Sequence, residues 1–154
     1  MNRIFENLYA NKELHAVLFG SICEKYDLTL TEILVLLFLK KNKNKESDTA
    51  TDIVEKLKIT KSHVSCSVRD LEERGYIRGI HVGKDRRSIH LQLCDKSTEI
   101  IREGEQIQNE FVSIIYRGFS DDELQTLNNY IQRMTENANG YLRDHDYRKG
   151  GSTG

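Results

Sequence analysis

The chain has 154 residues, of which 38% are hydrophobic and 31% are charged, and its formal net charge is −1. This length and composition are typical of a helix-rich globular chain with a core of its own, and they exclude a disordered or fibrous protein. No apolar run reaches the about 18 residues of a membrane-spanning helix, and the N-terminal segment lacks the apolar stretch of a secretory signal, so we expect a cytoplasmic protein with no membrane partner.

The net charge hides an uneven distribution along the chain. Residues 40–94 contain 13 lysines and arginines against 8 acids, a net charge of +5, whereas residues 95–146 contain 5 against 11, a net charge of −6. A cationic middle segment is typical of a surface that binds phosphate groups.

The first predicted helix covers residues 1–26, where apolar residues recur at the spacing of one helical face. These residues are Ile4, Phe5, Leu8, Val17, Leu18 and Ile22. A second helix is expected after Thr29, because its hydroxyl and the carboxylate of Glu32 form a capping box ahead of the apolar run ILVLLFLKK.

The next segment, residues 49–75, predicts a helix-turn-helix. Thr49 and Asp52 form a second capping box, which opens a short helix that runs through Leu57. Thr60 can cap the helix that follows the turn.

The second helix of this pair is expected to bury one stripe, formed by Val64, Val68 and Leu71. Its other side carries small and polar residues. Such side chains near a helix N-terminus would allow the backbone to lie deep in a DNA major groove.

The stretch from Leu71 to Leu93 then follows as a helix end, a strand, a basic loop and a second strand, which is the outline of a DNA-binding wing. Gly75 can take the left-handed conformation that ends a helix. After a turn at Gly83, residues 88–93 alternate polar and apolar, as in a strand with one buried face. The expected tip carries Lys84, Asp85, Arg86 and Arg87.

Two further helices are expected in the C-terminal third. Asp95 or Ser97 can cap the first, and Ser120 with Glu123 forms a third capping box ahead of the second. Their apolar stripes are Ile107, Phe111, Ile114 and Ile115, then Leu124, Leu127, Ile131, Met134 and Leu142. Helices outside a compact winged core have little of their own domain to pack against, so we expect them to pack between two subunits.

With these elements in place, the chain resembles the MarR family of bacterial winged-helix transcription regulators over residues 5–143. The most specific similarity is LEERGYI followed by DRRS, because the family's wing carries a D-x-R signature that corresponds here to Asp85, Arg86 and Arg87. The segments LTLTEILVL and FSDDE also resemble the family.

The resemblance implies a mainly α fold of the α+β winged-helix type, in a single domain over residues 1–146. The winged helix-turn-helix would cover about residues 29–94. Dimerisation helices at about 1–26 and 95–144 would form a homodimer, and residues 147–154 are expected to be a flexible tail.

The predicted DNA-binding residues lie on the second helix of the pair and at the wing tip. They are Thr60, Lys61, Ser62, His63, Ser65, Cys66, Arg69, Lys84, Asp85, Arg86 and Arg87. The fork of Arg69 matches guanine O6 and N7, whereas the alternative is an ion pair with Glu72 or Glu73 on its own helix. At the wing, Arg86 or Arg87 is expected to enter a minor groove while Asp85 orients an arginine, and the alternative is a solvated hairpin tip.

We therefore expect a homodimeric repressor that binds a pseudo-palindromic double-stranded DNA operator and responds to a small-molecule effector. In this family an effector commonly settles between the dimer helices and the DNA-binding core. Here His15, Phe19, Tyr26 and Phe38 could line such a crevice, and core packing is the alternative for the aromatic residues.

The cysteines and histidines leave another switch open. Cys66 lies on the DNA-facing side near a helix N-terminus, so oxidation of its thiol could switch binding, or it is a small surface residue. Cys23 and Cys94 fit core packing. His81 and His90 could face each other across the wing strands, which is half a metal site at most.

No phosphate-binding glycine loop, nucleophile elbow or catalytic grouping is present in the sequence. We expect no enzyme, no catalytic residue, no cofactor and no metal. The alternative from a different class is a winged-helix module whose wing arginines bind an acidic protein.

Overall fold

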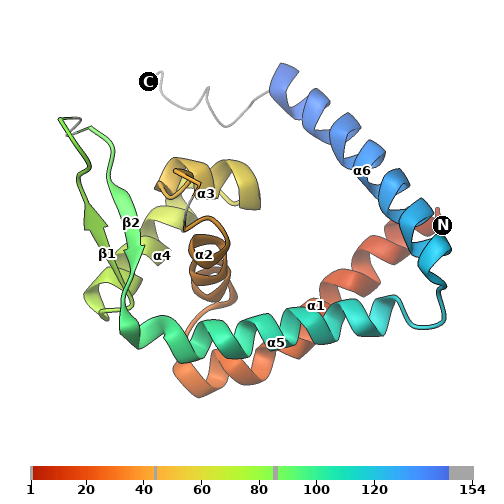
Figure 1. The fold of residues 1–154 in the computed structure, drawn as a ribbon, viewed down its shortest axis with the longest axis horizontal. Helices are drawn as coiled ribbons and strands as arrows, with labels where there is room; N and C mark the ends of the chain where they lie inside the picture. The colour runs from red at the N-terminus through yellow and green to blue at the C-terminus, as the bar shows by residue number, and fades with distance from the viewer. Residues whose placement is uncertain (1, 44, 85–86, 146–154) are drawn as a thin grey trace. The chain divides into compact units, whose positions relative to one another are not determined.

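The computed structural model describes residues 2–43, 45–84 and 87–145. Within them the elements follow in the order α1 (Arg3–Tyr26), α2 (Leu30–Lys41), α3 (Ala50–Leu57), α4 (Lys61–Glu73), β1 (Ile77–Ile80), β2 (His90–Leu93), the 3-10 turn η1 (Asp95–Ser97), α5 (Thr98–Ile115) and α6 (Asp121–Asp144) (Figure 1). The chain divides into two compact units, residues 1–111 and 112–154. The first contains α1 through most of α5, and the second contains the end of α5 and α6.

The starts of four helices confirm the predicted capping chemistry. Thr29, Thr49 and Ser120 each accept a hydrogen bond from the backbone N–H three residues later, and the acid at that position accepts one from the backbone N–H of the capping residue. The Thr60 hydroxyl accepts a 3.3 Å hydrogen bond from the N–H of His63. These bonds satisfy donors that the first turn of a helix leaves unpaired.

The start of α5 shows that the prediction of a cap at Asp95 or Ser97 is wrong. The turn η1 leads directly into α5 at Thr98. Cys94, the residue at the N-cap position of η1, makes no side-chain capping bond. The buried Ser97 hydroxyl instead donates a 2.7 Å hydrogen bond to the Cys94 carbonyl. Serine can bond backward in this way as readily as it caps, so the residue type alone does not decide between the two.

The end of α4 confirms the prediction for Gly75, which has a left-handed φ of +78°. The N–H of Tyr76 donates to the Leu71 carbonyl at 2.9 Å, and the N–H of Gly75 donates to the Glu72 carbonyl at 3.0 Å. This pair of bonds is a Schellman motif, which satisfies the last carbonyls of the helix. It directs the chain into β1.

The wing sheet consists of β1 and β2 in antiparallel register from the pair Ile77 and Leu93 to the pair Ile80 and His90. The sequence alternation predicted a strand from residue 88, but β2 begins at His90 because its partner β1 ends at Ile80. His90 therefore pairs with Ile80, and the suggested pairing with His81 is wrong. On its other edge β2 is joined to the loop before α3, through a bridge between Thr49 and His90.

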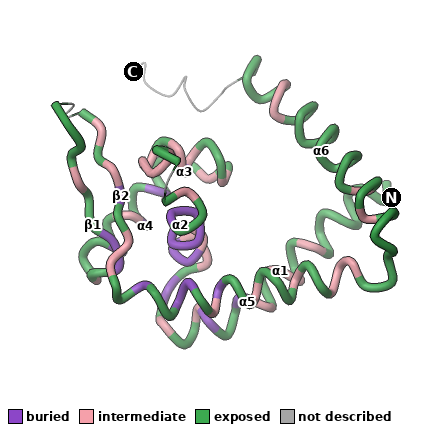
Figure 2. Tube along the Cα trace, viewed as in Figure 1, coloured by how far each residue is buried: buried purple, intermediate pink, exposed green. Residues whose placement is uncertain are grey.

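The core of the first unit is centred on α2, whose residues are buried on nearly all sides (Figure 2). A helix that is apolar all round belongs inside a fold, and Ile33, Val35 and Leu36 are fully buried. α5 approaches α2 closely at Gly104, where an added Cβ would lie 3.0 Å from Cδ2 of Leu37.

In the second unit, α6 has no buried residue although it is 24 residues long. The Tyr116 hydroxyl donates a 3.1 Å hydrogen bond to Asn128 Oδ1, which joins the end of α5 to α6. Large apolar side chains are exposed along α6: Tyr130, Ile131, Met134, Tyr141 and Leu142. None of the helices in the described part of the chain has the length and apolarity needed to cross a bilayer.

Candidate nucleic-acid interface

α4 presents one buried and one exposed surface. Val64 and Leu71 are fully buried as predicted, and Val68 is half-buried. Ser67 is also buried, with 4% of its surface exposed; its place three residues after Val64 and four before Leu71 is the signal that could have found it. The predicted DNA-binding residues of this segment are all exposed: Thr60, Lys61, Ser62, His63, Ser65, Cys66 and Arg69.

The Arg69 side chain is 65% exposed and lies along the surface of its own helix. Its Nη2 is 3.7 Å from Sγ of Cys66, and its Nε is 4.0 Å from Oδ1 of Asp70. Glu72 and Glu73 were the alternative ion-pair partners of Arg69, but Glu72 accepts a hydrogen bond from the wing instead. Arg69 therefore presents a guanidinium held only by long contacts to its described neighbours.

The wing carries exposed cations on both sides of its tip. Lys84 and Arg87 are exposed, while Asp85 and Arg86, which were also predicted to bind DNA, lie outside the described residues. On the strands, Arg78 Nε donates a 2.7 Å hydrogen bond to Gln92 Oε1, and this places a further cation on the sheet.

Two residues that were not predicted hold the wing against α4. A carboxylate oxygen of Glu72 accepts a 2.8 Å hydrogen bond from the backbone N–H of Gly79 on β1. At Gly79 an added Cβ would lie 2.7 Å from Cγ2 of Ile89 and 3.0 Å from the Glu72 oxygen, so glycine permits the close approach. The sequence offered no signal for this contact, because the two residues are joined only once the hairpin has folded back.

The wing is also joined to the loop that precedes α3. Nδ1 of His90 lies 2.5 Å from Oδ1 of Asp48, with about a quarter of each side chain exposed. The backbone N–H of Leu91 donates a 2.9 Å hydrogen bond to the Asp48 carbonyl. Through these bonds and Glu72, the helix-turn-helix and the wing form one connected surface.

A run of exposed lysines at the end of α2 adds to the positive charge and was not among the predicted site residues. Its members are Lys40, Lys41, Lys43 and Lys45. None of them forms an ion pair with another residue that the structure describes. The signal was present in the charge count of the middle segment.

Comparison with known proteins agrees with this geometry. Residues 26–88 match the sequence model of the MarR family. The chain is 28% identical, over 131 residues, to the HTH-type transcriptional regulator BilQ of Clostridioides difficile (strain CD3), and the match covers 82% of each chain. Over these residues the chain is similar to the MarR family of transcription regulators.

Two further proteins extend the comparison. The HTH-type transcriptional regulator PecS of Dickeya dadantii (strain 3937) is 28% identical over 115 residues, which cover 73% of this chain and 68% of PecS. A putative MarR family transcriptional regulator from Listeria monocytogenes, whose crystal structure is of a complex with 26mer DNA, matches the fold with a TM-score of 0.81. It is 17% identical and covers 100% of this chain and 97% of its own. The mainly α winged-helix fold is thereby confirmed.

The four residues predicted to line an effector crevice lie in different surroundings. Phe19 and Phe38 are buried in the core, with 1% and 8% of their surfaces exposed. The ring of His15 is 4.7 Å from that of Phe19 and 5.7 Å from that of Phe111, and burial lowers the pKa of this histidine. Tyr26 is half-buried and is bonded to α5.

The hollows of about 210 Å³ and about 130 Å³ in the first unit lie elsewhere. The larger is lined by Leu39, Lys43, Asp48, Ile80 and residues 91–93. The smaller is lined by Lys40, Lys43, residues 93–95, Ser97, Thr98 and Ile101. Neither includes any of the four predicted effector residues.

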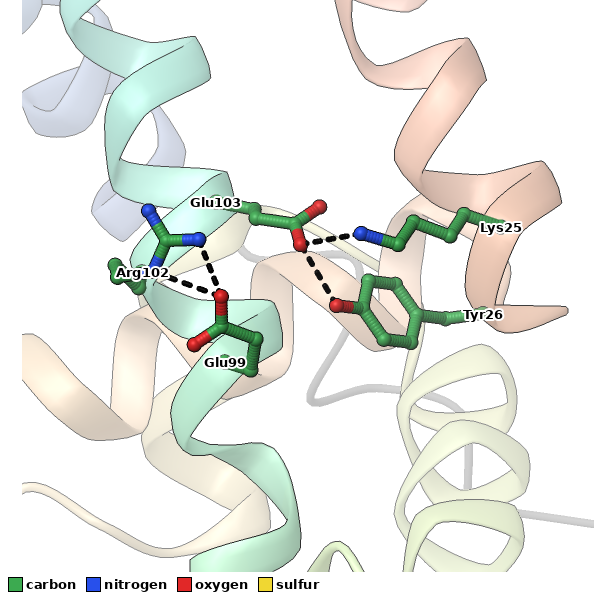
Figure 3. A network of polar contacts seen from close by, with 5 residues as sticks. All are labelled: Lys25, Tyr26, Glu99, Arg102 and Glu103. Atoms are coloured by element: carbon green, nitrogen blue, oxygen red, sulfur yellow. Dashed lines mark hydrogen bonds and ion pairs between the residues drawn. The ribbon is translucent and has the colours of Figure 1, made fainter.

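A polar network joins the end of α1 to α5 (Figure 3). One carboxylate oxygen of Glu103 accepts hydrogen bonds from Lys25 Nζ at 2.6 Å and from the Tyr26 hydroxyl at 2.8 Å. These bonds lower the pKa of Glu103 and raise those of Lys25 and Tyr26. Arg102 pairs with Glu99 one turn away, within α5.

The three cysteines are free thiols in different environments. Cys66 is exposed on α4, whereas Cys23 and Cys94 are half-buried, and burial raises the pKa of Cys23. Among the residues that the structure describes, no three histidine, cysteine or acidic side chains are grouped as metal ligands would be.

Proposed function

We propose that this chain is a sequence-specific DNA-binding transcription regulator that acts as a homodimer on a pseudo-palindromic operator. The observation that carries the proposal is the exposed polar and cationic face of α4 beside a wing that carries exposed cations. Small exposed residues such as Ser62 and Ser65 would allow the helix to approach base edges, and the exposed Lys61 would bind a phosphate. Each α4 would lie in a major groove, and each wing would reach the adjoining minor groove.

The names of the relatives support the same function. BilQ and PecS are both named as transcriptional regulators, and the Listeria neighbour is named as a complex with DNA. These names favour a regulator over an enzyme, and they favour the cytoplasm as its place of action, because a bacterial regulator must reach the chromosome.

Exposed apolar side chains support a homodimer. In the first unit they lie on α1: Ile4, Phe5, Leu8, Tyr9 and Val17. In the second unit the exposed Ile131 and Met134 continue the 3-4 spacing of the half-buried Leu124 and Leu127 along α6, which is the spacing of a packing seam. Apolar surface of this extent on helices is typical of a subunit interface, and a second copy of the chain is the partner that we propose.

We further propose that the regulator is a repressor controlled by a small-molecule effector. An effector can change DNA affinity only if it binds the operator-competent arrangement and another arrangement unequally. His15 and Tyr26, at the edges of the core, remain the residues of the predicted set that a ligand could reach; Phe19 and Phe38 would act from within the core.

Selection of bound sequences from random DNA duplexes tests the proposal. The purified protein should recover a motif with twofold symmetry and half-sites about one helical turn apart, ~34 Å. The logarithm of its affinity should fall linearly with the logarithm of salt concentration, with a slope near −0.9 per phosphate contact. Failure to enrich any motif, with no salt-dependent binding, would contradict the proposal and favour a module that binds an acidic protein.

The same binding assay separates the proposed effector from the two other switches. Peroxide should leave operator affinity unchanged if the exposed Cys66 is not a redox sensor. Zinc and a chelator should likewise leave operator affinity unchanged if no metal controls binding. A large loss of affinity on oxidation that Cys66→Ser abolishes would transfer the switch to the thiol.

A further inference from the structure

Arg74, the residue that ends α4, reaches back to the end of α1. Its Nη1 donates a 2.5 Å hydrogen bond to the Asp27 carbonyl, and its Nη2 donates a 2.9 Å hydrogen bond to the Tyr26 carbonyl. The partners are 47 and 48 residues apart in sequence, so one side chain joins the end of the DNA-facing helix to a helix outside the winged core.

The carbonyls that Arg74 binds are available because of how α1 ends. Asp27 adopts a left-handed conformation with φ 51°, and its N–H donates to the carbonyls of Cys23 and Glu24. The carbonyls of the last residues of a helix have no partner within the helix, and they form the negative end of its dipole. A guanidinium with two parallel donors satisfies both carbonyls at once and supplies a positive charge.

The main chain of Arg74 is held by Lys96 in η1. Lys96 Nζ donates a 2.6 Å hydrogen bond to the Arg74 carbonyl. Both cations also lie over the ring of the buried Tyr76, with Lys96 Nζ 4.4 Å and Arg74 Cζ 5.4 Å from the ring centroid. These contacts restrict the directions that the Arg74 side chain can take.

The same end of α1 is bonded to α5. Lys25 and Tyr26 donate to Glu103 (Figure 3). With the bonds of Arg74, residues 25–27 form a junction between the ends of α1 and α4 and the first half of α5. The contacts of Arg74 supply the bond from this junction to α4.

We infer that Arg74 is a positioning residue that fixes the orientation of α4 relative to α1 and α5 and so selects the half-site spacing that the dimer accepts. The inference rests on the proposed function, because α1 carries one of the exposed apolar faces through which the two copies would be joined. One base pair changes the separation of two half-sites by about 3.4 Å and turns one about the DNA axis relative to the other. A firmly held α4 cannot follow that change, whereas an α4 freed at its C-terminal end can.

The experiment uses the duplex that wild-type protein selects, with versions that have one base pair inserted or removed at the centre. Wild type should bind the altered spacings roughly tenfold more weakly than the selected duplex, as for a mismatched site. Arg74→Ala should bind the three duplexes within about threefold of one another, because the bonds to both carbonyls are lost. Arg74→Lys keeps the charge but not the two-donor fork, and should lie between them.

Arg102→Ala is the matched control. It removes one arginine whose partner, Glu99, lies on its own helix, and it should keep the spacing preference of wild type. The slope of affinity against salt should be the same in all variants, since Arg74 is not proposed to touch a phosphate. If Arg74→Ala does not fold, Arg74→Lys carries the test.

Three outcomes would overturn the inference. Folded Arg74 variants could keep the full spacing preference of wild type, which would reduce the residue to a stabilising role. They could lose about one unit of salt slope with the preference intact, which would make Arg74 a phosphate contact. Wild type could select no duplex at all, and only that result would remove the proposed function as well.

Discussion

Replacing Arg69 with alanine separates a DNA contact from a structural one. The Arg69 side chain is 65% exposed, and its described partners are Cys66 at 3.7 Å and Asp70 at 4.0 Å. Contacts this long at an exposed site contribute little, so the free energy of unfolding should change by less than about 0.5 kcal/mol. Loss of a two-donor guanine contact costs about 1 to 3 kcal/mol, so affinity should fall about 5- to 150-fold for each half-site.

Two measurements on the same protein samples test this prediction. Urea unfolding gives the stability, and fluorescence anisotropy gives the affinity for the selected duplex and for a panel with single base-pair replacements. Arg69→Ala should lose discrimination at one base pair of each half-site, whereas Arg102→Ala should bind the whole panel like wild type. An unchanged binding profile, or an equal loss across the panel with a shallower salt slope, would refute the assignment of Arg69 to a base.

Three further predictions concern stability. Gly20→Ala should raise the free energy of unfolding by about 0.5 to 1 kcal/mol, because a Cβ there meets nothing within 4 Å. Gly104→Ala should have a free energy of unfolding about 1 to 3 kcal/mol lower than that of Gly20→Ala, because its Cβ crowds Leu37. Equal free energies for the two variants in urea unfolding would contradict the close packing of α5 on α2. Thr49→Ala should cost about 1 kcal/mol by removing the cap of α3, and a neutral result in the same assay would show that the cap is dispensable. Burial lowers the pKa of His15 below its usual 6.5, so the unfolded state takes up the proton first, and stability falls as the pH drops through 6.5. His15→Leu should reduce the fall of the urea midpoint between about pH 7 and 5. The same dependence of the urea midpoint on pH in both proteins would contradict this prediction.

Local chemistry made much of the fold predictable from the sequence. The capping boxes at Thr29, Thr49 and Ser120 each need only a hydroxyl and an acid three residues later, and all three form. The glycine at 75 ends α4 because a left-handed residue is needed there. The residues that form these bonds lie within one helical turn of each other, so the sequence alone identifies both partners.

The predictions that failed depended on choices between equivalent local bonds or on partners distant in sequence. Ser97 bonds backward rather than forward, and β2 begins only where β1 is present to pair with it. The bonds from Arg74 to α1 and from His90 to Asp48 join residues more than 40 positions apart. Neither spacing nor composition specifies which distant groups the folded chain will bring together.

The candidate site divides in the same way. The exposed face of α4 followed from helical periodicity, and it is where the predicted DNA-binding residues of that helix lie. The supports of the wing, Glu72 and Gly79, required the folded hairpin to be identified. The positive charge of the middle segment was already enough to predict that the lysines at the end of α2 belong to the DNA-binding surface.

In the proposed complex, two copies of α4 and its wing bind twofold-related half-sites of one duplex. Light scattering of the purified complex with the selected duplex measures this most directly, because the mass of each chain is 17.9 kDa. We expect a complex of two chains on one duplex, and a dimer in the absence of DNA. A single chain that stays monomeric and forms no complex with any duplex, even at low salt, would contradict this expectation.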